Sequence, residues 1–190
     1  IYTTVWSLNV VDVLMAIVIA SVIRLGRKDG IVAELFKLFG VFCTIFITLH
    51  YYVHLADFLR KNFFGKDAVT EIFSYCLLAI SVFSAFMFVA KGWDLILRIK
   101  SFEAVDRWGN LALSLVRSYF ICSMIFLALL LSGGKFIVPQ ANRSVSWFLF
   151  RKPAVEFYRA SYRALVEKIF PGEEINKKVF KLIEDTPPWK

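Results

Sequence analysis

The chain has few of the residues, and none of the short motifs, on which enzymes commonly rely. Of its 190 residues, two are histidine and three are cysteine. It contains no GxSxG, no HExxH and no glycine-rich phosphate loop, so the common signatures of nucleophilic, zinc and phosphoryl chemistry are missing. The odd number of cysteines and the lack of a CxxC pair argue against a disulfide framework. We therefore expect no enzymatic activity, no cofactor, and buried free thiols at Cys43, Cys76 and Cys122.

Charge is missing from long parts of the chain. Hydrophobic residues make up 58% of it and the mean hydropathy is +0.64, more than a globular core of this size needs. Residues 72–90 contain no charge, and residues 111–131 contain Arg117 alone. About 20 residues of α-helix cross a hydrocarbon core of about 30 Å. We predict an all-α polytopic membrane protein with about four transmembrane helices in residues 1–134, at 5–23, 31–52, 72–90 and 111–131.

The first of these spans contains a shorter uninterrupted apolar run than the others. Asn9 and Asp12 interrupt it, so that residues 13–23 alone are apolar without a break. A tilted or re-entrant segment therefore stays open as an alternative to a full crossing. A basic turn follows it, and we expect residues 50–71 to form a polar connection between the second and third spans.

Residues 135–190 differ in character and predict an amphipathic helical tail. Proline residues bound a helix with an apolar stripe at helical spacing, made of Val155, Tyr158, Tyr162, Leu165 and Ile169. A second, shorter helix has a narrow apolar stripe made of Ile175, Val179 and Ile183. Both helices need a surface that covers these stripes.

The formal net charge of +8 points to the lipid bilayer rather than to nucleic acid, because the basic residues gather between the spans and in the tail. The connections after the first and third spans are both rich in lysine and arginine. The positive-inside bias therefore predicts that these connections face the cytoplasm and that both termini lie on the outer side. The basic residues of the tail work against this orientation.

A few charged residues lie inside the predicted spans. Glu34 and Lys37 are three residues apart, so they can pair on one helix face. With four spans, Glu34, Lys37, Asp94 and Arg117 belong to one side of the membrane and Asp12 to the other. Arg117 must snorkel, face water, or pair with Glu34 or Asp94. Two interpretations stay open: these residues hold helices together, or they line a polar pathway. For Asp12, helix capping competes with proton or ion handling.

Side chains near the span ends allow a similar comparison. His50, His54 and Asp57 share one face of a continuous helix, but a lone helix with aromatic residues between its histidines favours interfacial histidines over a metal site. The tryptophans near the span ends predict an aromatic belt at the headgroups, made of Trp93, Trp108 and Trp147.

Two stretches carry a resemblance to a known family. The first, LNVVDVLMAIVIASVIRLGRKDGIVAELFKLFG, contains Asn9, Asp12, Gly26, Gly30 and Glu34. The second, DRWGNLALSLVR, contains Asp106, Arg107, Gly109 and Arg117. Together they resemble the colicin V production protein family over about residues 8–132. The start of the last span departs from the family pattern, because polar and small residues stand where glycines are expected, at Asn110, Ser114 and Ser118. Small residues still allow close approach of helices.

The resemblance implies a small protein of the bacterial inner membrane with about four spans. It also implies a link to bacteriocin export and envelope homeostasis, without a molecular activity. Some relatives carry a protease domain after the last span, but the tail of this chain has no catalytic set, so protease activity is not expected here.

Three functional hypotheses follow. The first is a scaffold or accessory subunit of an envelope or export-related complex, because the chain lacks a catalytic set and its tail has unpartnered apolar stripes. The second is a homo-oligomeric channel or transporter with a polar path near Asp12, Glu34 and Arg117; four spans are few for one subunit, so self-association is required. The third is a lipid sensor whose tail responds to surface charge.

Overall fold

The computed structural model describes residues 9–26, 31–62, 67–96, 103–133, 137–169 and 174–184, and every regular element in these ranges is helical. Four long helices come first: α1 (Val10–Gly26), α2 (Ile31–Asn62), α3 (Asp67–Ile96) and α4 (Glu103–Leu131). Short helices follow: α5 (Ile137–Asn142), α6 (Val145–Phe150), α7 (Pro153–Ser161), the π-helical turn η1 (Tyr162–Val166), α8 (Glu167–Ile169) and α9 (Lys177–Glu184). The prediction of an all-α protein is confirmed.

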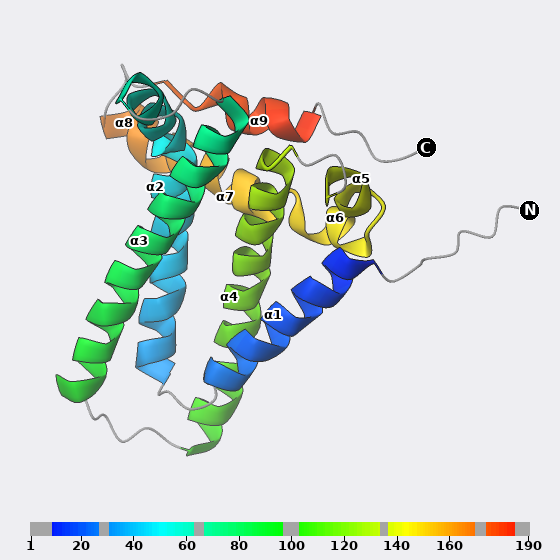
Figure 1. Cartoon of the computed structure of the whole chain (residues 1–190). Helices are drawn as coiled ribbons and strands as arrows, with labels where there is room; N and C mark the ends of the chain where they lie inside the picture. Colours follow the sequence, from blue (N-terminus) through cyan, green and yellow to red (C-terminus); the bar gives the residue numbers. More distant parts are fainter. Residues whose placement is uncertain are drawn as a thin grey trace, which may run out of the picture.

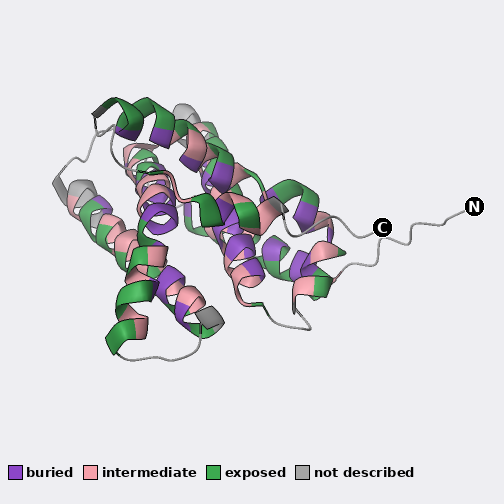
Figure 2. Cartoon of the chain, turned by 90° about the horizontal axis from the view of Figure 1, so that it is seen from above, coloured by how far each residue is buried: buried purple, intermediate pink, exposed green. Residues whose placement is uncertain are grey.

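The long helices form a bundle, and the short ones gather near one of its ends (Figure 1). Helices α2 and α3 pack as an antiparallel pair, α4 runs in the same direction as α2, and α1 lies diagonally across α4. Buried residues face the inside of this bundle and exposed residues face outward (Figure 2). The exposed large side chains on the long helices are mostly apolar, among them Phe39, Phe73, Leu77, Ile80 and Phe88. Such an outer surface suits contact with lipid chains.

Three helices in the described part of the chain are long and apolar enough to cross a membrane: Ile31–Asn62, Val69–Ala90 and Trp108–Leu131. The fourth, α1, has 17 residues, which is about 25 Å of helix, and it is inclined to the others (Figure 1). The predicted count of about four is therefore approximate. Helix α1 begins later than the predicted span because Asn9 precedes its first turn, and Val13 N–H donates to the Asn9 carbonyl. Residues 1–8 lie outside the described ranges.

The predicted polar connection at residues 50–71 is wrong for most of its length, since α2 continues to Asn62 and α3 starts at Asp67. Residues 50–64 contain no glycine or proline that would end the helix. Charged residues stabilise these extra turns: Arg60 Nη1 lies 3.1 Å from Asp57 and Arg60 Nη2 lies 2.9 Å from Glu71 of α3.

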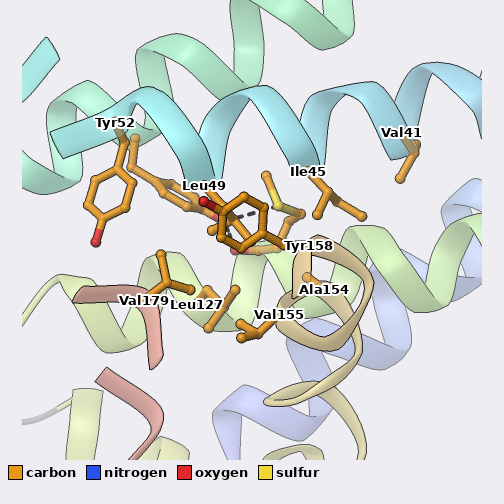
Figure 3. Packing of buried hydrophobic residues seen from close by; sticks show 11 residues of the cluster. Val41, Ile45, Leu49, Tyr52, Leu127, Ala154, Val155, Tyr158 and Val179 are labelled. Atoms are coloured by element: carbon orange, nitrogen blue, oxygen red, sulfur yellow. Dashed lines mark hydrogen bonds between the residues drawn. The ribbon is translucent and has the colours of Figure 1, made fainter. Parts of the chain in front are cut away.

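The tail packs into the bundle. Ala154, Val155 and Tyr158 of α7 and Val179 of α9 belong to one core cluster with residues of α2, α3 and α4. Figure 3 shows Tyr158 in the middle of this cluster, beside Leu49 of α2. The predicted need of the tail for a covering surface is therefore met within the chain.

One position of the predicted stripe is wrong. Leu165 is 56% exposed, whereas its neighbour Val166 is 8% exposed. The chain forms the π-helical turn η1 over Tyr162–Val166, and a π turn inserts one residue into the helical repeat. The apolar face therefore moves by one residue.

Trp147 also departs from the predicted aromatic belt: it is buried in a second core cluster between α1 and α4, whereas Trp108 is exposed.

Candidate functional site

A buried group of charges joins three long helices near the start of α2. Glu34 is 0% exposed, and its Oε2 accepts a hydrogen bond from Arg117 Nη1 of α4 at 2.9 Å. Its Oε1 accepts one from Ser114 Oγ at 2.9 Å. Lys37 Nζ lies 3.7 Å from Oε2, one turn along α2. Arg117 Nη2 also donates to the Val22 carbonyl of α1 at 3.4 Å. We name Glu34, Lys37, Ser114 and Arg117 the ion cluster.

The ion cluster favours one of the two interpretations left open for Arg117. Its guanidinium bonds to Glu34 and to the α1 backbone, so it joins α1, α2 and α4. Charges buried in a low dielectric need a partner of opposite sign and hydrogen bonds, and this arrangement supplies both. Asp94 lies on α3, and Asp106 and Arg107 lie on α4, but the side chains of all three are outside the described part of the structure; Gly30 also lies outside it.

Gly26 and Gly109 allow the close approach on which the ion cluster depends. A Cβ atom at Gly26 would collide with Ser114 Oγ and lie 2.9 Å from Glu34 Oε1. A Cβ atom at Gly109 would collide with Ile31 Cδ1. Gly26 is the last residue of α1, so its missing side chain lets the end of α1 reach the cluster.

Asp12 lies at the other end of α1, ten residues before Val22, or about 15 Å along the helix. Its Oδ1 accepts hydrogen bonds from Ser146 N–H at 2.9 Å and from Ser146 Oγ at 2.6 Å. Its Oδ2 accepts bonds from Asn9 N–H at 3.3 Å and from Val145 N–H at 3.4 Å. One carboxylate therefore caps the first turns of both α1 and α6. The structure does not bring Asp12 together with Glu34 and Arg117.

Two further contacts, which sequence reasoning missed, attach the tail. Ser123 of α4 donates from Oγ to the Phe150 carbonyl at 2.6 Å and accepts from Ala154 N–H at 2.9 Å. It thereby bonds the last carbonyl of α6 and an amide in the first turn of α7, which those short helices cannot bond themselves. The sequence holds no signal for this contact, because a serine within an apolar span is equally compatible with a local bond to its own helix.

The second missed contact involves Tyr158 of α7. Its hydroxyl lies 2.9 Å from His50 Nδ1 and accepts a hydrogen bond from Asn176 N–H at 3.1 Å. Asn176 Nδ2 donates to the Leu49 carbonyl of α2 at 2.7 Å. His50 is buried, while His54 is exposed and Asp57 pairs with Arg60; the interfacial position of the two histidines stays a prediction. No group of three or more possible metal ligands occurs among the described residues.

Arg151 lies in the link between α6 and α7, with its guanidinium 3.7 Å from the centre of the Trp147 ring. Burial lowers the pKa of Arg151. An arginine stays protonated under such a shift, and stacking on an aromatic face is a favourable way to hold its charge in a partly dehydrated place.

The sequence was also compared with known protein families. A family model described as colicin V production protein matches residues 11–150. The chain belongs to the colicin V production protein family. No curated protein and no solved structure matches the chain.

Some of the contacts described above lie within the residues that the family model matches, and others connect later helices to them. The ion cluster and the bonds of Asp12 to α6 lie within residues 11–150, so the colicin V production family region extends past the last long helix and includes α5 and α6. The match therefore continues beyond residue 132, where the resemblance in the sequence ended. Helices α7 to α9 follow the matched region, and the bonds of Tyr158 and Asn176 connect them to it.

Proposed function

We propose that this member of the colicin V production family is a non-catalytic scaffold or accessory subunit of a complex in the bacterial inner membrane. The observation that carries the proposal is the use of its intramembrane polar groups. Glu34, Ser114 and Arg117 bond to one another across helices, and Asp12 bonds to α6. Side chains used in this way stabilise an arrangement of helices.

The rival proposal of a homo-oligomeric channel requires Asp12, Glu34 and Arg117 to line one path. Asp12 and the ion cluster belong to opposite ends of α1, and each carboxylate accepts several hydrogen bonds from its own chain. Opening such a path would break a buried ion pair, which typically costs about 3–5 kcal/mol. The scaffold is therefore the better-supported function.

The exposed surface also supports a partner role. Helix α3 has little of its membrane segment buried, and its outward side chains include Phe73, Leu77, Ile80 and Phe88. Helix α3 packs on α2 and, through Tyr75, on α4, and a membrane helix whose remaining surface is open can pack against helices of another protein.

The test is the composition of the particle extracted gently from native membranes, measured by native mass spectrometry and quantitative proteomics. A scaffold is expected to copurify with unrelated membrane proteins in a fixed molar ratio. The matched variant Glu34→Gln, in which the ion cluster loses its negative charge, should lower recovery of those proteins, while Arg24→Gln at an exposed site should not. A particle made of this chain alone, or full function restored by the purified chain in vesicles, would refute the scaffold.

A further inference from the structure

The link between α6 and α7 lies deep along the bundle. Ser123 bonds to Phe150 and to Ala154, so this link is fixed at the level of Ser123. Ser123 precedes the end of α4 at Leu131 by eight residues, which is about 12 Å of helix. Helices α5 and α6 and the start of α7 therefore lie beside the last turns of α4, below its end (Figure 1).

The depth of α7 can be compared with that of α3, because both pack against α2. Phe42 of α2 stacks on Phe157 of α7 with ring centres 4.5 Å apart, and Phe46 lies 5.8 Å from Tyr158. On the α3 side, Phe39 lies 6.1 Å from Phe86 and Tyr52 lies 5.9 Å from Tyr75. The two helices are antiparallel, so counting along both between these two pairs puts α2 residue 46 level with α3 residues 80–81. Tyr158 and Tyr162 also lie 6.1 Å and 6.2 Å from His50, which by the same comparison is level with α3 residue 77. The part of the tail from Phe157 to Tyr162 therefore lies at the depth of α3 residues 77–83, about 12 Å or more inside the start of the α3 membrane segment at Val69.

At this shared depth, the two outward faces differ in chemistry. The α3 face exposes Leu77, Ile80 and Phe88, as lipid chains require. The face formed by α7 and η1 exposes Lys152, Glu156 and Arg163 instead. Covering these charges with lipid chains would cost much free energy. Thinning of the membrane beside this face would bring the headgroups to the charges instead, and thinning costs only a fraction of a kcal/mol per ångström.

The charges of this outward face are mainly positive. Lys152, Arg159, Arg163 and Lys168 outnumber Glu156 and Glu167, and Arg159 pairs with Glu156 at 3.2 Å. We name the exposed side of residues 152–168 the basic notch. Two large apolar side chains of α6 border it, Phe148 at 59% exposed and Leu149 at 49%. Basic residues beside exposed apolar ones are typical of surfaces that lie among lipid headgroups.

We propose that the basic notch binds the headgroups of anionic phospholipids below the membrane boundary of the α3 face. The bilayer is then thinner beside α7 than beside α3. The phosphates lie near Lys152 and Arg163, and Phe148 and Leu149 contact the upper parts of the acyl chains. This binding surface is separate from the scaffold role, because it needs no protein partner.

The first experiment measures depth in nanodiscs, which expose both membrane faces to water. In a chain whose own cysteines are replaced by alanine, the variants Ala160→Cys and Ala164→Cys place a thiol on the exposed side of the notch. The variant Leu77→Cys places one on the exposed side of α3 at the level of His50, whose ring lies 6.2 Å from that of Tyr162. We expect a membrane-impermeant maleimide to label positions 160 and 164 and to leave position 77 unlabelled. Protection of both notch positions in the nanodiscs would overturn the proposal.

The second experiment measures lipid selectivity by native mass spectrometry from nanodiscs that mix phosphatidylglycerol with phosphatidylcholine. The intact protein is expected to retain phosphatidylglycerol preferentially, and the double variant Lys152→Gln with Arg163→Gln is expected to lose this preference. The control, Lys177→Gln with Lys181→Gln on α9, should keep it. Equal retention in both double variants would overturn the anionic-lipid assignment. Labelling at position 160 in nanodiscs but not in native membranes would also overturn it, in favour of a protein partner.

Discussion

Removing either charge of the central ion pair should destabilise the protein, but by different amounts. Glu34 carries the negative charge that lies between Arg117 Nη1, at 2.9 Å, and Lys37 Nζ, at 3.7 Å. The variant Glu34→Gln leaves two cations close together in a buried place, which is expected to cost about 3–5 kcal/mol. Arg117→Gln leaves Glu34 with Lys37 and with Ser114 at 2.9 Å, so we expect a smaller loss of about 2–3 kcal/mol.

The double variant tests the reasoning directly. In Glu34→Gln, Arg117 and Lys37 repel each other, and Arg117→Gln removes one of these two cations. The loss of stability in the double variant should therefore be smaller than the sum of the two single losses by at least about 1 kcal/mol. The assay is reversible unfolding in mixed detergent micelles, followed by circular dichroism. The control Arg24→Gln, at an exposed position, should change the free energy of unfolding by less than about 0.5 kcal/mol. Additive effects, or a larger loss for Arg117→Gln than for Glu34→Gln, would refute this account of the ion cluster.

Three further predictions use the same unfolding assay. Gly26→Leu should destabilise by about 1–3 kcal/mol through overpacking against α4, whereas Gly92→Ala, where a Cβ meets nothing within 4 Å, should be neutral or stabilising; equal effects would contradict the close approach. Ser123→Ala should cost about 1–3 kcal/mol because it leaves two buried backbone groups unbonded, and Ser21→Ala at an exposed site should be silent. Tyr158→Phe should cost about 1 kcal/mol and speed limited proteolysis after α7; an unchanged cleavage rate would show that its hydroxyl does not hold the tail.

The residues explain why some features could be predicted from the sequence. The helices follow from apolar length, and the Glu34–Lys37 contact follows from a separation of three residues on one helix. For Arg117, the sequence reduced the choice of partner to two acidic residues. A buried arginine needs a partner of opposite charge, and the alternation of spans puts Glu34 and Asp94 on its side of the membrane.

The missed features depend on contacts between distant parts of the chain. The bonds of Asp12 to Ser146 join residues 134 positions apart, and no periodic pattern encodes such a separation. The burial of Trp147 depends on the space between α1 and α4, which is set by the inclination of α1. Val166 is buried in place of Leu165 because of a single π turn, and a pattern counted at 3.6 residues per turn does not predict such a turn.

The two hydrogen bonds of Ser123 have a consequence for sequence variation. Both go to backbone atoms, the Phe150 carbonyl and the Ala154 amide, so they do not depend on which side chains stand at those two positions. A substitution at position 150 or 154 would therefore change the packing of a buried side chain and keep both bonds, whereas loss of the hydroxyl at position 123 would remove both bonds and keep that packing. The point at which the tail joins the bundle is therefore set by a side chain of the fourth long helix and by the backbone of the tail.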